Sequence, residues 1–311
     1  MLVYLLRRLL YTIPIVFGVA LIVFTLFHLV GGDPVYTMLG KYATVEKVAE
    51  LRHELGFDQP KYMQFLHYCK QIVTFDYGRS YRSREEISTM IWNGIGPSLS
   101  LTVPAFLINI LIAISIALLV SYYRGRWIDK VGIVLCVAGM SISSLAFILF
   151  GQYYFAFKLG WFPISGYEPH FPDFLQFIAL PVIIYVMIGI GVDVRFFRTA
   201  ILDETSQDYV RTARAKGVSD RVVFFKHVLK NSMIPIITFT VIEIPFLILG
   251  TLLLENYFGI PGLGSITVEA VHNSDFAVLK AMTTIYSLLN IIGNIATDML
   301  YSVVDPRVSL K

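Results

Sequence analysis

Several uninterrupted apolar runs of about twenty residues constrain most strongly what this sequence can fold into. A helix rises 1.5 Å per residue, so about 20 apolar residues cross a hydrocarbon core of about 30 Å. Six such runs stand between charged segments, at residues 9–30, 97–120, 131–157, 174–192, 233–254 and 281–304. Only 15% of the 311 residues are charged, against about 25% in soluble domains. We therefore predict an all-α membrane protein with six transmembrane helices and one domain, 1–311.

The distribution of Lys and Arg predicts how these helices are oriented. Short loops rich in basic residues resist translocation across the membrane. Basic residues gather at both chain ends and in residues 123–130 and 193–232, whereas residues 160–173 and 255–279 contain none. Both termini are therefore predicted to be cytoplasmic. The first apolar run is longer than the core of a signal peptide, so we interpret it as a retained anchor.

Residues 31–96 are predicted to form a small extracytoplasmic element. Apolar residues at helical spacing occupy residues 45–57, which include a glycine after the last of them, and residues 61–75 show the same pattern. We expect two short helices that lie against the outer membrane face.

The cytoplasmic loop at residues 193–232 carries the pattern most informative about function. A helix is expected from about Ser206 to Lys216, closed by Gly217, which can adopt the left-handed conformation. A second helix, capped by Ser219 or Asp220, would continue into the fifth span. The first helix bears small residues at positions 213 and 217 and basic residues beside them, which suits it to a groove with acidic rims in another protein.

The sequence here resembles the permease subunits of binding-protein-dependent ABC importers, in the branch for dipeptides, oligopeptides and nickel. The resemblance rests on DYVRTARAKG at residues 208–217 and HVLKNSMIPII at residues 227–237, and it extends to the first span, the outer loop and LENYFGIPGLGSITVEAVHNSDF at residues 254–276. The wider family has Glu-Ala-Ala, three residues and Gly in this loop. Here Arg211 and Thr212 replace the first two positions, and Ala213 and Gly217 keep the pattern.

The resemblance implies a transport subunit of the bacterial inner membrane that is not itself an enzyme. Its expected partners are a second, homologous permease, two ATP-binding subunits and an extracytoplasmic substrate-binding protein. No phosphate-binding G-x-x-x-x-G-K-[ST] loop is present, so ATP and magnesium are expected on the partner ATPases and no cofactor on this chain. The residues expected to couple to the ATPases are Asp208, Tyr209, Arg211, Thr212, Ala213, Arg214, Ala215, Lys216 and Gly217.

Polar residues within the apolar runs are candidates for the transport pathway. Glu243 is a carboxylate inside the fifth run, where it would either line the pathway or make a buried structural hydrogen bond. Asn290, Asn294 and Asp298 recur at four-residue spacing in the sixth run. They would line a pathway or bind neighbouring helices, and we favour helix packing.

The sequence shows no arrangement typical of a catalytic or metal site. The six histidines lack metal-ligand spacing, and no nucleophile with a base or pair of catalytic carboxylates is recognisable. We assign no catalytic, cofactor-binding or metal-binding residue. The alternative function is a self-contained secondary transporter or channel, which would not need the segment at residues 208–217. Peptides are the favoured substrates, with nickel chelates and oligosaccharides as the other candidates.

Overall fold

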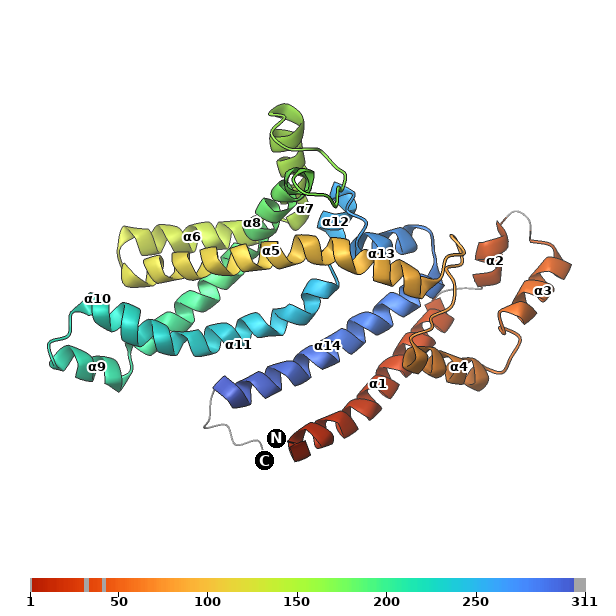
Figure 1. Cartoon of the computed structure of the whole chain (residues 1–311), viewed down its shortest axis with the longest axis horizontal. Coiled ribbons are helices and arrows are strands. Elements are labelled where there is room, and N and C mark those ends of the chain that lie inside the picture. Colours follow the sequence, from red (N-terminus) through yellow and green to blue (C-terminus); the bar gives the residue numbers. More distant parts are fainter. Residues whose placement is uncertain (1, 31–33, 41–42, 305–311) are drawn as a thin grey trace.

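Long helices that run roughly along one direction dominate the chain in a computed structural model (Figure 1). The structure describes residues 2–30, 34–40 and 43–304. Within these ranges the only extended pairing is a single bridge between Arg79 and Glu86. The long helices are α1 (Leu2–Val30), α5 (Ile87–Tyr122), α6 (Trp127–Ser141), α8 (Asp173–Thr205), α11 (Leu229–Ile248) and α14 (Phe276–Val304). The predicted all-α fold class is confirmed.

Five helical stretches are long and apolar enough to cross a membrane, and a bent pair makes a sixth span if it counts as one. The predicted number of spans is therefore confirmed within this range. The single stretches lie at Leu10–Phe27, Ile87–Tyr122, Asp173–Thr205, Asp220–Ile248 and Phe276–Thr297. The predicted C-terminal end of the chain beyond residue 304 lies outside the described residues.

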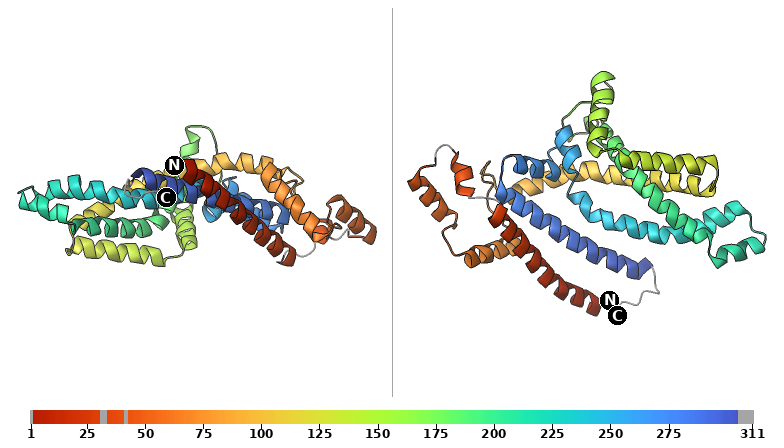
Figure 2. Two further views of the ribbon diagram at one scale, coloured as in Figure 1. Left: turned by 90° about the horizontal axis from the view of Figure 1, so that it is seen from below. Right: turned by 180° about the vertical axis from the view of Figure 1, so that it is seen from behind.

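The third predicted span, 131–157, is not one straight helix. α6 is followed by α7 (Ser144–Gly151) and the π-helix η2 (Gln152–Lys158), and the two parts meet at 91°. Ile142, between them, has an extended backbone. The Ser141 hydroxyl donates to the Val137 carbonyl at 2.8 Å, a local bond of the kind that bends helices. α7 consequently projects sideways from the bundle (Figure 2).

Two other predicted ends differ from the structure. The fourth span was expected to end at residue 192, but α8 continues to Thr205, so Asp193 belongs to the helix. The fifth was expected to reach residue 254, but α11 ends at Ile248 because Gly250 has a positive φ of 71°. The chain then forms two short helices, α12 (Leu252–Phe258) and α13 (Leu263–His272), before α14 begins.

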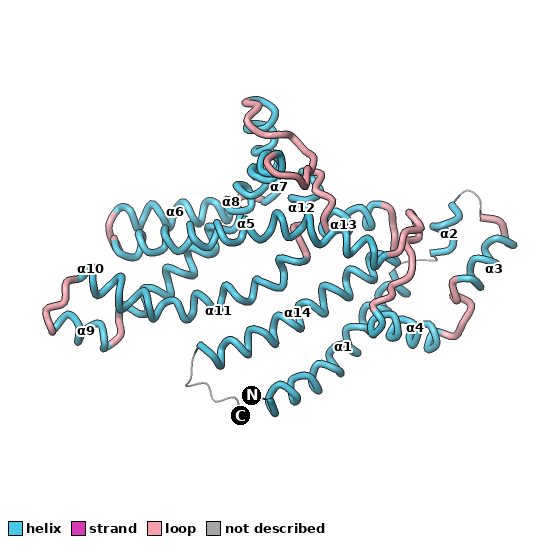
Figure 3. The backbone as a smooth tube through the Cα atoms, viewed as in Figure 1, coloured by secondary structure: helices cyan, strands magenta, loops and turns pink. Residues whose placement is uncertain are grey.

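The predicted helices of the segment 31–96 are present as α3 (Val45–Glu54) and α4 (Lys61–Thr74), joined by loops (Figure 3). A further short helix, α2 (Pro34–Leu39), precedes them. α3 begins at Thr44, whose hydroxyl accepts a hydrogen bond from the Lys47 amide at 3.4 Å. α4 packs on α1 and α14 through the buried Tyr68 and Ile72.

The centre of the bundle is the pairing of α5 with α8. Ala105, Ala113 and Ala117 of α5 are fully buried, and these small side chains let the two helices approach closely. Near one end, the latter two alanines pack against Phe197 and Ile201 of α8. The segment between α8 and α11 lies at this same end of the bundle (Figure 1). We call this end of the bundle the elbow end.

Candidate functional site

The helix predicted in the cytoplasmic loop is present as α9 (Asp208–Ala215) at the elbow end. Lys216 caps it, and Gly217 follows with a φ of 79°, the left-handed conformation that the sequence predicted. The amides of Gly217 and Val218 donate to the carbonyls of Arg214 and Ala213 at 2.9 and 3.2 Å. The helix therefore ends in a defined turn.

One side of α9 is anchored to the bundle. Val210 is fully buried in the same apolar cluster as Phe197 and Ile201 of α8. Tyr209 donates a hydrogen bond to Glu204 at 2.7 Å and thereby ties α9 to the last turn of α8. Ala213 is half-buried against this cluster, so its side chain contributes less to the free face than the sequence analysis expected.

The other side of α9 is open and mostly charged. Arg211 lies 3.5 Å from Asp208, and Arg214 lies 3.1 Å from Asp220, with all four side chains more than half exposed. Such exposed pairs contribute little to stability, so these groups are free to bind another protein. The exposed residues of this face are Asp208, Arg211, Thr212, Arg214, Ala215, Lys216 and Gly217.

Beyond Gly217 the chain passes into α11 almost without interruption. α10 (Asp220–Val222), the π-helix η3 (Val223–Val228) and α11 follow one another and together count as one apolar stretch. Ser219 occupies the predicted cap position, although its side chain makes no capping bond. A displacement of α9 can therefore reach α11 through a single bend at Gly217.

A polar cavity of about 650 Å³ lies beside this bend. It is bounded by the turn after α5, the end of α8 and the start of α10. Four arginines and one carboxylate supply its charged lining: Arg124, Arg126, Arg214, Arg221 and Asp220. The elbow end thus presents a basic recess next to a basic helix face.

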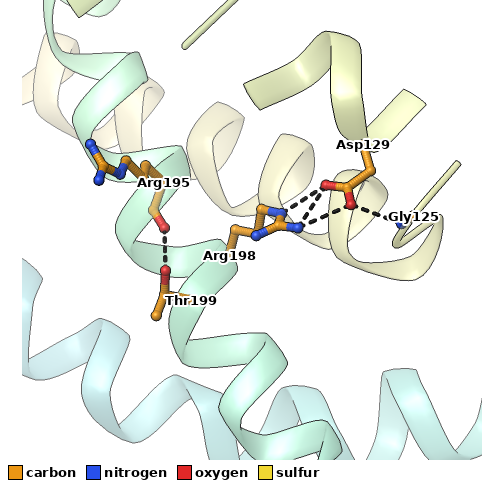
Figure 4. A network of polar contacts seen from close by, with 5 residues as sticks. All are labelled: Gly125, Asp129, Arg195, Arg198 and Thr199. Carbon is orange, nitrogen blue, oxygen red and sulfur yellow. Dashed lines mark hydrogen bonds and ion pairs between the residues drawn. The ribbon is translucent and has the colours of Figure 1, made fainter. Parts of the chain in front are cut away.

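A buried ion pair, which the sequence analysis missed, fixes α6 to α8 near the elbow end (Figure 4). Arg198 donates to both carboxylate oxygens of Asp129, from Nε at 2.8 Å and from its terminal nitrogen at 3.0 Å. The Gly125 amide donates to the same carboxylate at 2.8 Å. The Asp129 and Arg198 side chains are only 6% and 20% exposed, so this two-point bond holds the helices in register.

Glu243 of α11 lies near a second carboxylate rather than alone. It is half-buried and within electrostatic range of Asp193 on α8. The Asn109 amide donates to Asp193 at 2.5 Å, and both of those residues are buried. The sequence placed Asp193 at the start of the cytoplasmic loop, but α8 extends through it, so a second carboxylate lies within a long helix.

Asn290 and Asn294 belong to α14 and line a cavity whose lining does not include Glu243. Asn294 donates to Asn290 at 2.8 Å, and both line a cavity of about 820 Å³ between α1, α14 and the end of α11. α14 meets α11 between them, where Gly293 faces Pro245. Glu243 and the asparagine pair therefore do not line one common cavity in the single chain. The side chain of Asp298 lies outside the described residues.

The turn GIPGLG surrounds a buried carboxylate that the sequence analysis did not single out. Glu255 of α12 is 0% exposed and accepts hydrogen bonds from four donors. They are Ser98 Oγ at 3.0 Å, Thr251 N at 2.8 Å, Gly264 N at 2.8 Å and Ser265 N at 3.4 Å. Side chains at positions 250, 262 and 264 would collide with this carboxylate or with Ser98, so these positions need glycine. The signal in the sequence that could have indicated this buried carboxylate was a glutamate with three glycines close to it in the chain.

Comparison with known proteins covers nearly the whole chain. The family described as "Binding-protein-dependent transport system inner membrane component" matches residues 109–310. "Binding-prot-dependent transport system membrane comp, N-term" matches residues 1–102. The predicted family resemblance is therefore confirmed.

Full-length relatives agree with this assignment. The "Glutathione transport system permease protein GsiC" of Salmonella choleraesuis (strain SC-B67) is 37% identical, and the match covers 100% of both chains. Proteins of the same name from Shigella flexneri serotype 5b (strain 8401) and Escherichia coli (strain K12) are 35% and 34% identical over the same full length. The chain therefore belongs to the family of inner membrane components of binding-protein-dependent transport systems and is a multi-pass permease component of an ABC importer.

Proposed function

We propose that this chain and a second, homologous permease together form the translocation pathway of an ATP-driven importer, and that α9 receives movement from separate ATPase subunits. The observation that carries the proposal is the construction of α9. One side is held by Val210 and Tyr209, the other is open and charged, and Gly217 connects the helix to α11. ATP and magnesium would be bound by the ATPases.

The coupling would be mechanical. ATP-driven closure of the ATPases displaces α9, and the stretch from Asp220 to Ile248 moves with it as one lever. A π-helical segment such as η3 often marks a functional site within a helix. ATP thereby biases the permease pair between inward-facing and outward-facing arrangements, with no chemical step in this chain. Both termini are proposed to lie on the ATPase side.

Short peptides or similar small solutes are the proposed cargo. The relatives carry the name of glutathione transport, and glutathione is a small, anionic peptide. An external binding protein would deliver the solute to the end of the bundle opposite the elbow. Glu243, Asn290 and Asn294 are polar groups of α11 and α14 that stay accessible in the single chain, and we include them as residues that line the pathway.

Co-purification from the native membrane tests the coupling. The wild-type chain carries a tag, and mass spectrometry identifies the proteins that elute with it under mild detergent. We expect a second permease and ATPases with P-loops to accompany the wild type. Ala215→Arg, on the open face of α9, should release the ATPases while the second permease remains.

Gly217→Arg and Gly125→Arg form a matched pair for the same experiment. Both glycines have a φ of 79°, and a side chain at either would meet no atom within 4 Å. Gly125 lies in the turn between α5 and α6, so its substitution introduces the same backbone strain at the elbow end without altering α9 or its connection to α11. Loss of ATPases from the Gly217 variant alone supports the proposal. Equal loss from both variants, or a wild type that elutes alone, contradicts it.

A further inference from the structure

A second cavity, of about 580 Å³, lies among elements at the end of the bundle opposite the elbow, where α4 and the start of α14 are found (Figure 1). It is lined mainly by the end of α3, by α4, by the loop between α4 and α5, and by the first turns of α14. Four basic residues and two acidic ones contribute to its lining: Lys70, Arg79, Arg84, Lys280, Glu54 and Asp76. The cavity therefore has a surplus of positive charge, and it is separate from α9 and independent of the coupling proposal.

Lys280 is the basic residue of this cavity that lies deepest in the fold. Its side chain is half-buried, and its ammonium group lies 4.7 Å from the centre of the Tyr68 ring. It makes no ion pair with any residue that the structure describes. The half-buried ammonium group therefore lacks an anionic partner among the described residues.

The nearest carboxylate in the sequence, Asp275, is already occupied. It accepts hydrogen bonds from Ser80 Oγ at 2.5 Å and from the amides of Tyr81, Arg82 and Val278 at 3.2 to 3.3 Å. These bonds fasten the loop before α5 to the start of α14. Asp275 thus has a structural role, and its carboxylate is already hydrogen-bonded without Lys280.

Tyr77 supplies a second, independent sign of a ligand. It also lines the cavity, it is 7% exposed, and its hydroxyl is buried without a hydrogen-bond partner. By contrast, the hydroxyl of the neighbouring Tyr68 is hydrogen-bonded to Thr284 at 2.5 Å. Burial raises the pKa of Tyr77 to about 12, so the hydroxyl keeps its proton and remains a donor. A buried donor without an acceptor is unfavourable unless a ligand or water fills the place.

We propose that this cavity binds one oxyanion, a carboxylate or a phosphate, between the Lys280 ammonium group and the Tyr77 hydroxyl. The ammonium supplies the charge, and the phenol supplies a directed hydrogen bond. The group can belong to a phospholipid of the surrounding leaflet or to a dissolved solute, because both present the same oxygens. The two sources differ in whether an acyl chain is needed for binding.

Calorimetric titration of the full-length chain in an uncharged detergent tests the site. Three probes are compared: dihexanoyl phosphatidylglycerol, inorganic phosphate and acetyl-alanyl-alanine. At least one should bind saturably to the wild type. Lys280→Met removes a charged donor and should weaken binding of that probe about tenfold or more. Lys280→Arg keeps the charge and should still bind the probe. Tyr77→Phe should weaken binding several-fold.

Lys61→Met is the matched control, because Lys61 is an exposed lysine at the start of α4 outside the cavity lining. It should bind like the wild type. Binding of phosphatidylglycerol alone supports the site with a lipid as its source, and binding of phosphate or the peptide supports it with a dissolved source. If no probe binds saturably, or if Lys61→Met weakens binding as much as Lys280→Met, the proposal is overturned.

Discussion

Replacing Glu255 by glutamine isolates the contribution of the buried carboxylate beside the glycine turn. The two side chains have nearly the same shape, so the substitution opens no cavity. It does place an amide NH₂ where one carboxylate oxygen accepts two hydrogen bonds. Oε1 accepts from Ser98 and Thr251, and Oε2 accepts from Gly264 and Ser265.

The magnitude follows from these contacts. If the NH₂ group replaces Oε1, it can donate to Ser98, but the Thr251 amide then faces another donor. If it replaces Oε2, two backbone amides face it. One or two unsatisfied buried donors, together with weaker neutral bonds at the other oxygen, amount to a loss of about 3 kcal/mol. For a chain of this length, that loss corresponds to roughly 5 °C in the melting temperature.

Thermal unfolding of the purified chain in detergent measures this effect. Glu269→Gln is the matched control, because Glu269 lies on α13 in the same hairpin but is exposed. We expect the control to melt with the wild type and Glu255→Gln to melt clearly lower. Burial raises the pKa of Glu255, while its four donors act in the opposite direction. A Glu255→Gln variant that melts with the control would refute the role assigned to the carboxylate.

Three further predictions concern other contacts. Arg198→Met should destabilise the chain by about 3 kcal/mol because it leaves Asp129 buried with only the Gly125 amide as a donor. Adding Asp129→Asn should recover part of this loss, and additive losses in the double-mutant cycle would argue against the ion pair. Gly293→Ala should destabilise the chain by about 1–3 kcal/mol because the new methyl group overlaps Pro245, whereas Gly139→Ala, with open space around it, should not. Equal melting temperatures of the two variants would contradict the predicted overlap. The hydrogen bond and charge of Asp58 raise the pKa of His53 above its ordinary 6.5, so this pair stabilises the fold at lower pH, and the effect is lost as pH rises through the folded-state pKa. An NMR titration should show a raised His53 pKa that Asp58→Asn lowers, and a His53 pKa that Asp58→Asn leaves unchanged would count against the bond.

Features that depend on neighbours in the chain were predictable from the sequence. Apolar runs placed the spans, and a glycine after a short amphipathic helix placed the left-handed bend at Gly217. The glycine after residues 45–55 likewise marked the end of α3. In each case the determining information is local: hydrophobic period, helix capping and the conformations available to glycine.

Features that depend on distant parts of the chain could not be predicted in this way. Asp129 and Arg198 stand far apart in sequence, and only the packing of α6 on α8 brings them together. Asp193 looked like the start of a loop because a carboxylate normally ends an apolar run, but Asn109 of α5 provides it with a buried partner. Glu255 is held mainly by backbone amides on both sides of α12, where three glycines leave room for the carboxylate. The 91° bend between α6 and α7 interrupts a run that contains no charged residue.

Site-specific photocross-linking on α9 is the most direct test of coupling to the ATPases. Benzoyl-phenylalanine is introduced at Ala215, which is exposed, or at Ala213, which is half-buried toward the bundle. After irradiation of intact cells, adducts of the tagged chain are isolated and sequenced. Coupling through the open face of α9 predicts an adduct with an ATPase subunit from position 215 and much less from position 213. The absence of any ATPase adduct from position 215, in cells where the chain still supports transport, would contradict it.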